Sequence, residues 1–121
     1  MSKMILVVDD EPDVVNFLKI RLESCGFGIT RGYNGEEALR LTEEVMPDLI
    51  ILDVMMPEPN GFVVCKRLKD NPKYKHIPIV LLTAKITESD KFWGQEAGAD
   101  AYITKPYNPE ELMSTITTLL S

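Results

Sequence analysis

The sequence predicts an α/β fold of the (βα)5 type, in which a five-stranded parallel sheet is doubly wound with helices on both faces. Two observations predict it. Short β-branched apolar segments alternate along the chain with longer segments whose apolar residues recur at helical spacing. The strongest strand segments are also apolar on consecutive positions, as in parallel strands buried on both faces. Right-handed crossovers between such strands place the intervening helices on both sides of the sheet.

Five segments are predicted to be strands. Four of them are short, apolar and rich in β-branched residues: Met4–Val8, Leu49–Leu52, Ile79–Leu82 and Ala101–Thr104. The segment Gly28–Gly32 carries polar residues and is expected to lie nearer an edge of the sheet.

Helical patterns fill the gaps between these strands. Pro12 stands at a helix start, and the apolar residues after it recur at helical spacing until Gly26 stops them. Side-chain caps and breakers mark the remaining expected helices, which are Gly35–Met46 after an Asn34 cap, Gly61–Leu68, Glu88–Ala97 after a Thr87 cap, and a last helix that opens at Asn108-Pro109.

Length and composition indicate one domain over residues 1–121. The chain has 13 Lys and Arg against 19 Asp and Glu, and its net charge of −6 argues against a direct nucleic-acid surface. No apolar run approaches the roughly 18 residues of a membrane-spanning helix. Cys25 and Cys65 have neither metal-ligand spacing nor a disulfide framework around them, so reduced thiols in a cytoplasmic protein are expected.

Polar groups stand where the apolar strands end. The first strand runs into the acidic stretch Asp9–Glu11, the third into Asp53, the fourth into Thr83 and the fifth into Lys105. In a doubly wound sheet the carboxyl ends of the strands form the site, so these carboxylates are expected to converge. Like charges that close repel unless cations lie among them, and Lys105 supplies only one. A carboxylate-rich oxygen site favours Mg²⁺ as the second cation, with Mn²⁺ as a substitute.

The same groups suit phosphoryl transfer. An aspartate carboxylate can attack a phosphoryl group to give an acyl phosphate. A metal and a lysine then balance the charge on the phosphoryl oxygens, and a nearby hydroxyl adds a hydrogen bond. Asp53 is the candidate nucleophile, and Thr83 and Lys105 are the candidate stabilising groups.

Four motifs now match a known family: VVDDEP at Val7–Pro12, D-x-x-M-P at Asp53–Pro57 with a glycine after it, LLTA at Leu81–Ala84, and GADAYITKP at Gly98–Pro106. Their order and spacing are specific, and they cover essentially the whole chain. The sequence closely resembles the receiver domain of two-component response regulators, including chemotaxis regulators. That resemblance implies a flavodoxin-like fold with strand order 2-1-3-4-5.

The resemblance also implies a role for each site residue. Asp53 would be the phosphoacceptor, and Thr83 and Lys105 would contact its phosphoryl group. The metal would be bound by Asp10, by Asp53, by the backbone oxygen of Met55, and by Asp9 through water. The Lys105-Pro106 peptide is expected to be cis.

Further residues are candidates for the change of state on phosphorylation and for the later loss of the phosphoryl group. The resemblance implies two switch residues, Thr83 and Tyr102, and Tyr102 matches the aromatic position that turns inward on activation in this family. Met55 and Lys85 lie two positions after Asp53 and Thr83, where side chains tune the access of hydrolytic water, so their bulk implies slow autodephosphorylation.

Trp93 is expected to be at least partly exposed, because it lies about 100° around its helix from Phe92, which is expected to face the core. It is either an interface anchor or a side chain that folds back over a neighbouring helix.

The expected function is a phosphorylation-activated signalling switch rather than a turnover enzyme. Its phosphodonor would be a histidine kinase or a histidine phosphotransfer protein. Phosphorylation would alter the surface of helix four, strand five and helix five. That surface would act on a downstream protein, an attached output domain or a second copy in a phosphorylation-dependent homodimer. The sequence leaves open whether the receiver stands alone or belongs to a longer regulator or hybrid kinase.

Two other classes of function fit parts of the sequence. A phosphatase or phosphotransferase of the haloacid-dehalogenase type also uses an aspartate nucleophile, but it usually carries a second aspartate where this chain has Met55. A nucleotide- or flavin-binding module would need glycines in the first strand–helix turn, and the acidic DDEP there would repel a phosphate. A receiver that has lost phosphorylation is disfavoured by the complete set of acidic, hydroxyl and lysine groups.

Overall fold

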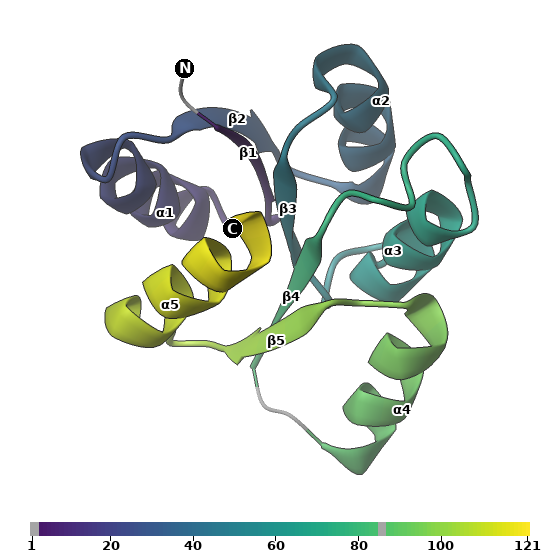
Figure 1. The fold of residues 1–121 in the computed structure, drawn as a ribbon. Coiled ribbons are helices and arrows are strands. Elements are labelled where there is room, and N and C mark those ends of the chain that lie inside the picture. The colour runs from purple at the N-terminus through teal and green to yellow at the C-terminus, as the bar shows by residue number, and fades with distance from the viewer. Residues whose placement is uncertain (1–2, 85–86) are drawn as a thin grey trace.

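A computed structural model describes residues 3–84 and 87–121 and shows five strands alternating with five helices (Figure 1). The strands are β1 (Met4–Val8), β2 (Gly28–Gly32), β3 (Leu49–Asp53), β4 (Ile79–Thr83) and β5 (Ala101–Thr104). The helices are α1 (Pro12–Ser24), α2 (Gly35–Val45), α3 (Gly61–Lys69), α4 (Glu88–Ala97) and α5 (Pro109–Leu120).

All strand pairs are parallel, and the sheet order is β2-β1-β3-β4-β5. The predicted (βα)5 fold and strand order are therefore confirmed. The order reverses between β1 and β3, which places the ends of these two strands next to each other. Figure 1 shows α1 and α5 on one face of the sheet and α2, α3 and α4 on the other.

Each face of the sheet has its own hydrophobic core. The even-numbered positions of β1 and β3, such as Leu6 and Ile50, pack with Val64 and Ala97 from the side of α2, α3 and α4. The odd-numbered positions pack with α1 and α5 in a second cluster. The middle strands β3 and β4 are buried along their whole length. The consecutive apolar residues that predicted them reflect this burial on both faces.

Side-chain caps begin four of the helices. Asn34, Asn60, Thr87 and Asn108 each accept a hydrogen bond from a backbone N–H of the first turn. Such caps satisfy donors that have no partner within the helix, which explains why the sequence located these starts well.

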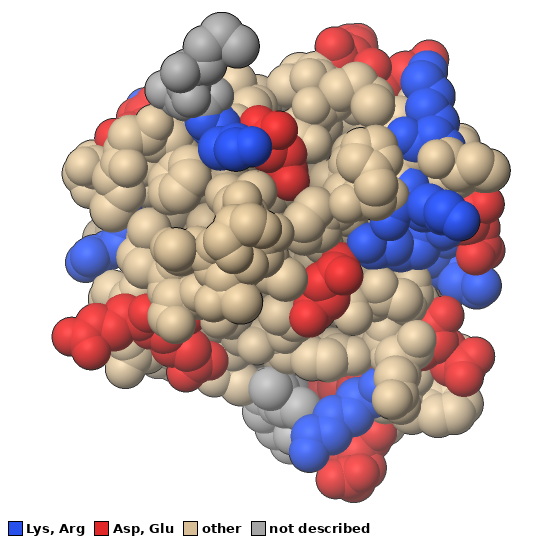
Figure 2. Space-filling view, in the orientation of Figure 1, with Lys and Arg blue, Asp and Glu red and all other residues tan. Residues whose placement is uncertain are grey.

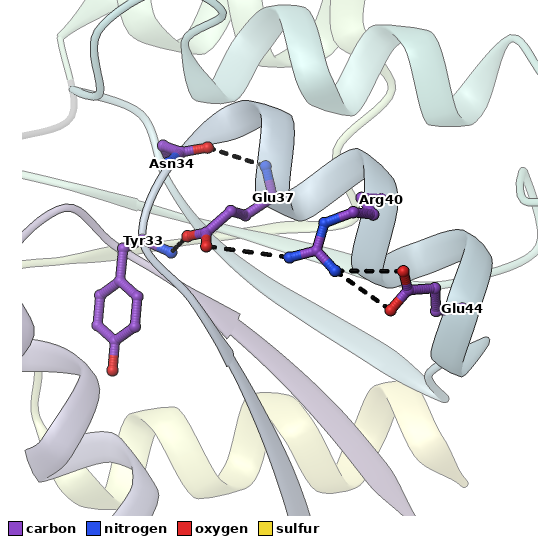
Figure 3. A network of polar contacts seen from close by, with 5 residues as sticks. All are labelled: Tyr33, Asn34, Glu37, Arg40 and Glu44. Atoms are coloured by element: carbon purple, nitrogen blue, oxygen red, sulfur yellow. Dashed lines mark hydrogen bonds and ion pairs between the residues drawn. The ribbon is translucent and has the colours of Figure 1, made fainter.

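The start of α2 carries a polar network, seen close up in Figure 3. The side chain of Asn34 accepts from Glu37 N at 2.8 Å, and the carboxylate of Glu37 reaches back to accept from Tyr33 N at 2.7 Å. Arg40 continues the network to Glu44 at 3.2 Å, one turn further along the helix. These contacts fix the first turn and the exposed face of α2.

Charged side chains are mixed on the face of Figure 2, with Lys and Arg gathered over α3. The last turn of α3 carries Lys66, Arg67 and Lys69, which suits the negative end of the helix dipole. Within the residues described, no helix combines the length and apolarity that a membrane crossing requires.

One expectation about α4 is wrong. Phe92 does not face the core, because 55% of it is exposed. The inner face of α4 consists instead of Gly94 and Ala97, and the physical reason is that a ring from β5 lies against Gly94. Trp93 is 53% exposed, as expected from its position on the helix.

Candidate functional site

Polar residues from four strands meet at the carboxyl edge of the sheet. Asp53 and Thr83 are the last residues of β3 and β4, and Asp9 follows β1 directly. Lys105 follows β5, and its backbone N–H donates to the carbonyl oxygen of Thr83 at 2.7 Å. The Lys105-Pro106 peptide is cis, as expected, and Glu58-Pro59 is a second cis bond.

The three aspartates converge. One carboxylate oxygen from each of Asp9, Asp10 and Asp53 lies within 4.8 Å of the others. Asp9 is fully buried and Asp53 is 2% exposed, whereas Asp10 lies at the surface. The predicted acidic cluster is therefore present, with one member open to solvent.

Lys105 is the cation that faces this cluster. Its Nζ lies 2.7 Å from Asp9, 3.4 Å from Asp53 and 3.5 Å from Glu11. Burial works to lower the pKa of Lys105, but the contact with Asp9 and the charge of Asp53 outweigh it, so the pKa is raised. Lys105 is therefore a fixed positive charge at neutral pH.

One cation does not balance this much negative charge. Burial, followed by the charge of Asp9, raises the pKa of Asp53 to about 6, although Lys105 and the N–H of Met55 act in the opposite direction. Oδ2 of Asp9 is buried beside Lys105 without a well-aligned hydrogen bond among the residues described. A hard divalent cation among these oxygens would relieve both conditions, so the donor set fits such an ion.

The loop after β3 holds Asp53 in place. Oδ1 of Asp53 accepts a hydrogen bond from the N–H of Met55 at 3.2 Å. Gly61 lies so close to the backbone of Asp53 that a Cβ at this position would overlap the carbonyl oxygen. Asn60 caps α3 through Val63 N at 3.1 Å. The sequence marked Gly61 only as part of a motif, and the close backbone approach gives it a physical role.

Met55 stands at the mouth of the site. Its side chain is 73% exposed and lines a hollow of about 440 Å³ that also includes Asp10 and Asp90. Lys85, the other residue expected to control water access, lies outside the described residues.

The two expected switch residues lie in different surroundings. Thr83 is buried at the end of β4, at the same edge as Asp53. Tyr102 is half-buried in β5, and its hydroxyl donates to the carbonyl oxygen of Lys91 in α4 at 3.4 Å. Burial raises the pKa of the Tyr102 phenol. The ring thus contacts α4, while Thr83 belongs to the acidic site.

The apolar surface of α1 was not foreseen from the sequence, whereas the exposure of Trp93 on α4 was. Phe17 and Ile20 of α1 are each 68% exposed, and Phe17 lines a hollow of about 570 Å³ that includes Lys105. Both residues lie outside the buried stripe of α1, so the helical spacing of its apolar residues could have predicted that they are exposed. Trp93 packs edge-to-face on Phe92 and borders a smaller hollow between α3 and α4.

Comparison with known proteins agrees with this geometry. The family model for the response regulator receiver domain matches residues 5–117. The alkaline phosphatase synthesis transcriptional regulatory protein PhoP of Bacillus subtilis is 46% identical over 120 residues, which make up 99% of this chain and 49% of PhoP. The DNA-binding dual master transcriptional regulator RpaA of Synechocystis is 38% identical, over 96% of this chain and 48% of RpaA. The chain thus spans about half the length of these curated relatives.

A solved structure shows the same fold. The signal receiver domain of a signal transduction histidine kinase from Syntrophus aciditrophicus is 40% identical and superposes with a TM-score of 0.92, covering 98% of this chain and 90% of the other. Sequence family, relatives and fold all agree. The chain belongs to the family of response regulator receiver domains.

Proposed function

We propose that this receiver accepts a phosphoryl group on Asp53 from a phosphohistidine of a histidine kinase or a histidine phosphotransfer protein. The observation that carries the proposal is the position of the Asp53 carboxylate, which lies at a strand end within 4.8 Å of two other acidic oxygens and 3.4 Å from Lys105 Nζ. This arrangement provides a nucleophile with positive charge beside it.

The proposed cofactor is Mg²⁺, for which Mn²⁺ can substitute. Asp10, Asp53 and the backbone oxygen of Met55 would hold it directly, and Asp9 would do so through water. Oδ1 of Asp9 accepts from Glu11 N at 2.9 Å, and Oδ2 lies 2.7 Å from Lys105 Nζ without a well-aligned hydrogen bond. A metal-bound water that donates to Oδ2 would supply that bond, which suits an indirect role. When bound, the ion neutralises charge on the site and on the incoming phosphoryl oxygens.

The chemical step moves the phosphoryl group from nitrogen to oxygen. A carboxylate oxygen of Asp53 forms a bond to phosphorus while the bond from phosphorus to the donor imidazole breaks, and the electron pair of that bond returns to the imidazole nitrogen. Lys105, whose Nζ lies 3.4 Å from Asp53, would pair with the transferred oxygens, and the Thr83 hydroxyl would donate a hydrogen bond to them. A carboxylate with a pKa near 6 is mostly ionised at neutral pH, as a nucleophile must be.

The proposed phosphodonor is a protein, so part of its surface must contact the residues around Asp53 and Lys105. The hollow beside Lys105 has apolar walls from Phe17, Pro106 and Tyr107, and exposed Ile20 extends this surface along α1. Exposed aromatic and aliphatic groups next to a reactive centre are suited to a transient protein contact. We place the donor protein on this face.

The output of the switch is a shift between two states of the surface formed by α4, β5 and α5. The new phosphoryl group would recruit Thr83 and Lys105, and Tyr102 would leave α4 and turn inward. The surface would then bind a downstream protein, an attached output domain or a second copy, with Trp93 as an interface anchor. Slow hydrolysis of the acyl phosphate, limited by Met55 and Lys85, would reset it.

The proposed unit is a single receiver domain over residues 1–121 that works in the cytoplasm. The two cysteines are free thiols, which suits a reducing compartment. The net charge of −6 supports action through proteins rather than through direct nucleic-acid binding by this domain.

The test is incubation with Mg²⁺ and a small phosphodonor such as acetyl phosphate, followed by mass spectrometry of wild type and Asp53→Asn. A mass gain of one phosphoryl group is expected in wild type and none in the variant. No gain in wild type would reject the proposal, and a gain in both proteins would move the phosphorylation site elsewhere.

A further inference from the structure

Gly94 occupies a position where a helix ordinarily favours another residue. It lies in the middle of α4, is buried, and its backbone lies outside the left-handed region that favours glycine. Glycine weakens a helix interior relative to alanine because it loses more backbone freedom on folding. Neither a turn nor a cap explains Gly94, so its missing side chain needs another reason.

The reason is the Tyr102 ring. A Cβ built at position 94 would overlap three atoms of Tyr102, namely the hydroxyl oxygen, Cζ and Cε1. The same hydroxyl donates to the carbonyl oxygen of Lys91, one turn earlier in the helix. The phenol therefore lies directly on the bare backbone of α4, between Lys91 and Gly94.

This contact differs from those of the other tightly packed glycines. At Gly35 and Gly61 the nearest atom to an added Cβ is a backbone oxygen, which a single rotamer change cannot move. At Gly94 every one of the nearest atoms belongs to the side chain of Tyr102. The ring can leave by rotation, so an added methyl group at position 94 would act on the position of Tyr102.

We propose that Gly94 is a positioning residue whose bare backbone forms the socket for the Tyr102 ring, so that it sets the balance between the two states of the switch. The effect on switching rests on the proposed function, because the inward movement of Tyr102 must break the contacts with Lys91 and Gly94. The contact between Gly94 and the Tyr102 ring does not depend on the proposed function. A methyl group at position 94 disfavours the ring position on α4 and leaves the acidic site untouched.

The socket is tested by a double-mutant cycle in urea unfolding with wild type, Gly94→Ala, Tyr102→Ala and the double variant. With Tyr102 present, Gly94→Ala should shift the unfolding midpoint down. With Tyr102→Ala in the background, the same substitution should shift it up, since only the better helix propensity of alanine remains. Gln95→Ala, at the exposed neighbouring position, should shift the midpoint equally in both backgrounds. Equal shifts for Gly94→Ala in the two backgrounds would overturn the socket.

A structural readout accompanies the cycle. Nuclear Overhauser contacts between the Tyr102 ring and the Gly94 α-protons are expected in wild type, and contacts of the ring with residue 94 should be lost in folded Gly94→Ala. Retention of these contacts in the variant would overturn the inference as well.

The link to switching is tested by titration with beryllofluoride, a phosphoryl mimic, in the presence of Mg²⁺. Gly94→Ala should lower the half-saturating beryllofluoride concentration severalfold, because the ring is already displaced from α4. Equal half-saturation in the two proteins would overturn the switching role. If wild type binds no beryllofluoride and gains no phosphoryl mass on Asp53, the proposed function fails, while the unfolding cycle still decides the socket.

Discussion

Asp53 is a carboxylate held at the end of a fully buried strand, in conditions that favour its neutral form. Removal from water raises its pKa to about 6, and the nearby charge of Asp9 adds to this, while Lys105 offsets only part of the effect. A folded protein that keeps such a group ionised at neutral pH loses stability by doing so. The cost of keeping Asp53 ionised is therefore electrostatic, and replacement of its carboxylate by a neutral group should reveal that cost.

Asp53→Asn is expected to stabilise the metal-free protein at neutral pH. Between pH 3.8 and about 6 the folded state binds more protons than the unfolded chain, so stability falls as pH rises through this window. At pH 7.5 the variant should be more stable than wild type by about 1–2 kcal/mol after screening, and the difference should shrink toward pH 4. Urea unfolding in the presence of a chelator measures it.

The control for this prediction is Asp70→Asn, which removes an exposed carboxylate whose side chain is 61% accessible. It should change stability little at either pH. A wild type more stable than Asp53→Asn at pH 7.5 without metal would show that Lys105 alone compensates the burial of Asp53.

Met55 is expected to prolong the life of the acyl phosphate. Its long side chain is exposed and lines a hollow with Asp10, where under the proposed function it would obstruct water that approaches a phosphoryl group on Asp53. Met55→Ala should shorten the half-life severalfold, as followed by loss of phosphoryl mass after the donor is removed. Met46→Ala is the matched control, because Met46 is also exposed but lines a hollow with Lys3 and Pro78, at the other end of the sheet. A wild-type half-life of only seconds would contradict the prediction.

At the scale of the elements, helix boundaries were predictable where a local signal sets them. The caps at Asn34 and Thr87 and the left-handed Gly98 placed the ends of their helices to within a residue or two. The inner face of α4 was only partly predictable, because the Tyr102 ring comes from another element and lies against Gly94, while Phe92 is exposed on a different side of the helix. Local chemistry fixes where a helix begins, whereas tertiary neighbours decide which side it buries.

The acidic site also has features that the sequence could predict and features that it could not. Residue type and strand order sufficed to bring Asp9, Asp10 and Asp53 together, because parallel strands end on one edge. The backbone approach of Gly61 and the exposed Phe17 next to Lys105 depend on distances between separate loops and helices. Residue spacing along the sequence does not determine those distances, so these two features could not be predicted.

The exposed pair on α4 leads to a prediction about association. Trp93 and Phe92 pack edge-to-face with more than half of each side chain in solvent, and Trp93 also borders an apolar hollow against α3. The proposed homodimer requires that beryllofluoride with Mg²⁺ raise the sedimenting mass of wild type. Trp93→Ala should abolish that increase, while circular dichroism stays native. Its cost in stability should be small, about 0.5 kcal/mol.

Gln95→Ala, on the exposed side of the same helix, is the control for Trp93 and should leave association intact. Unchanged self-association and unchanged partner binding in folded Trp93→Ala would show that the tryptophan only covers the groove between α3 and α4.

Across the whole molecule, the two edges of the sheet carry different polar networks. The carboxyl edge gathers charges that favour a cation and a phosphoryl group. At the opposite edge, Lys69 of α3 pairs with Asp100 at 2.8 Å and donates to the carbonyl oxygens of Ile77 at 2.8 Å and Lys75 at 3.2 Å. Asp100 in turn accepts from Ile79 N at 2.8 Å. This second network joins α3 to the segments before β4 and β5.

The separation of the two edges predicts that stability and phosphorylation can be changed independently. Lys69→Met keeps most of the apolar stem but leaves Asp100 and two carbonyl groups without their cation, in a site where only 15% of the lysine side chain is exposed. The variant should lose about 2 kcal/mol of unfolding free energy, yet incorporate phosphoryl groups at the wild-type rate at a temperature where it stays folded. Lys66→Met, which breaks an exposed pair with Asp70 on the same helix, should cost at most about 0.5 kcal/mol. A slower phosphorylation of folded Lys69→Met would mean that the amino edge of the sheet is coupled to the acidic site, because the contacts of Lys69 with Asp100, Lys75 and Ile77 all lie at the amino edge.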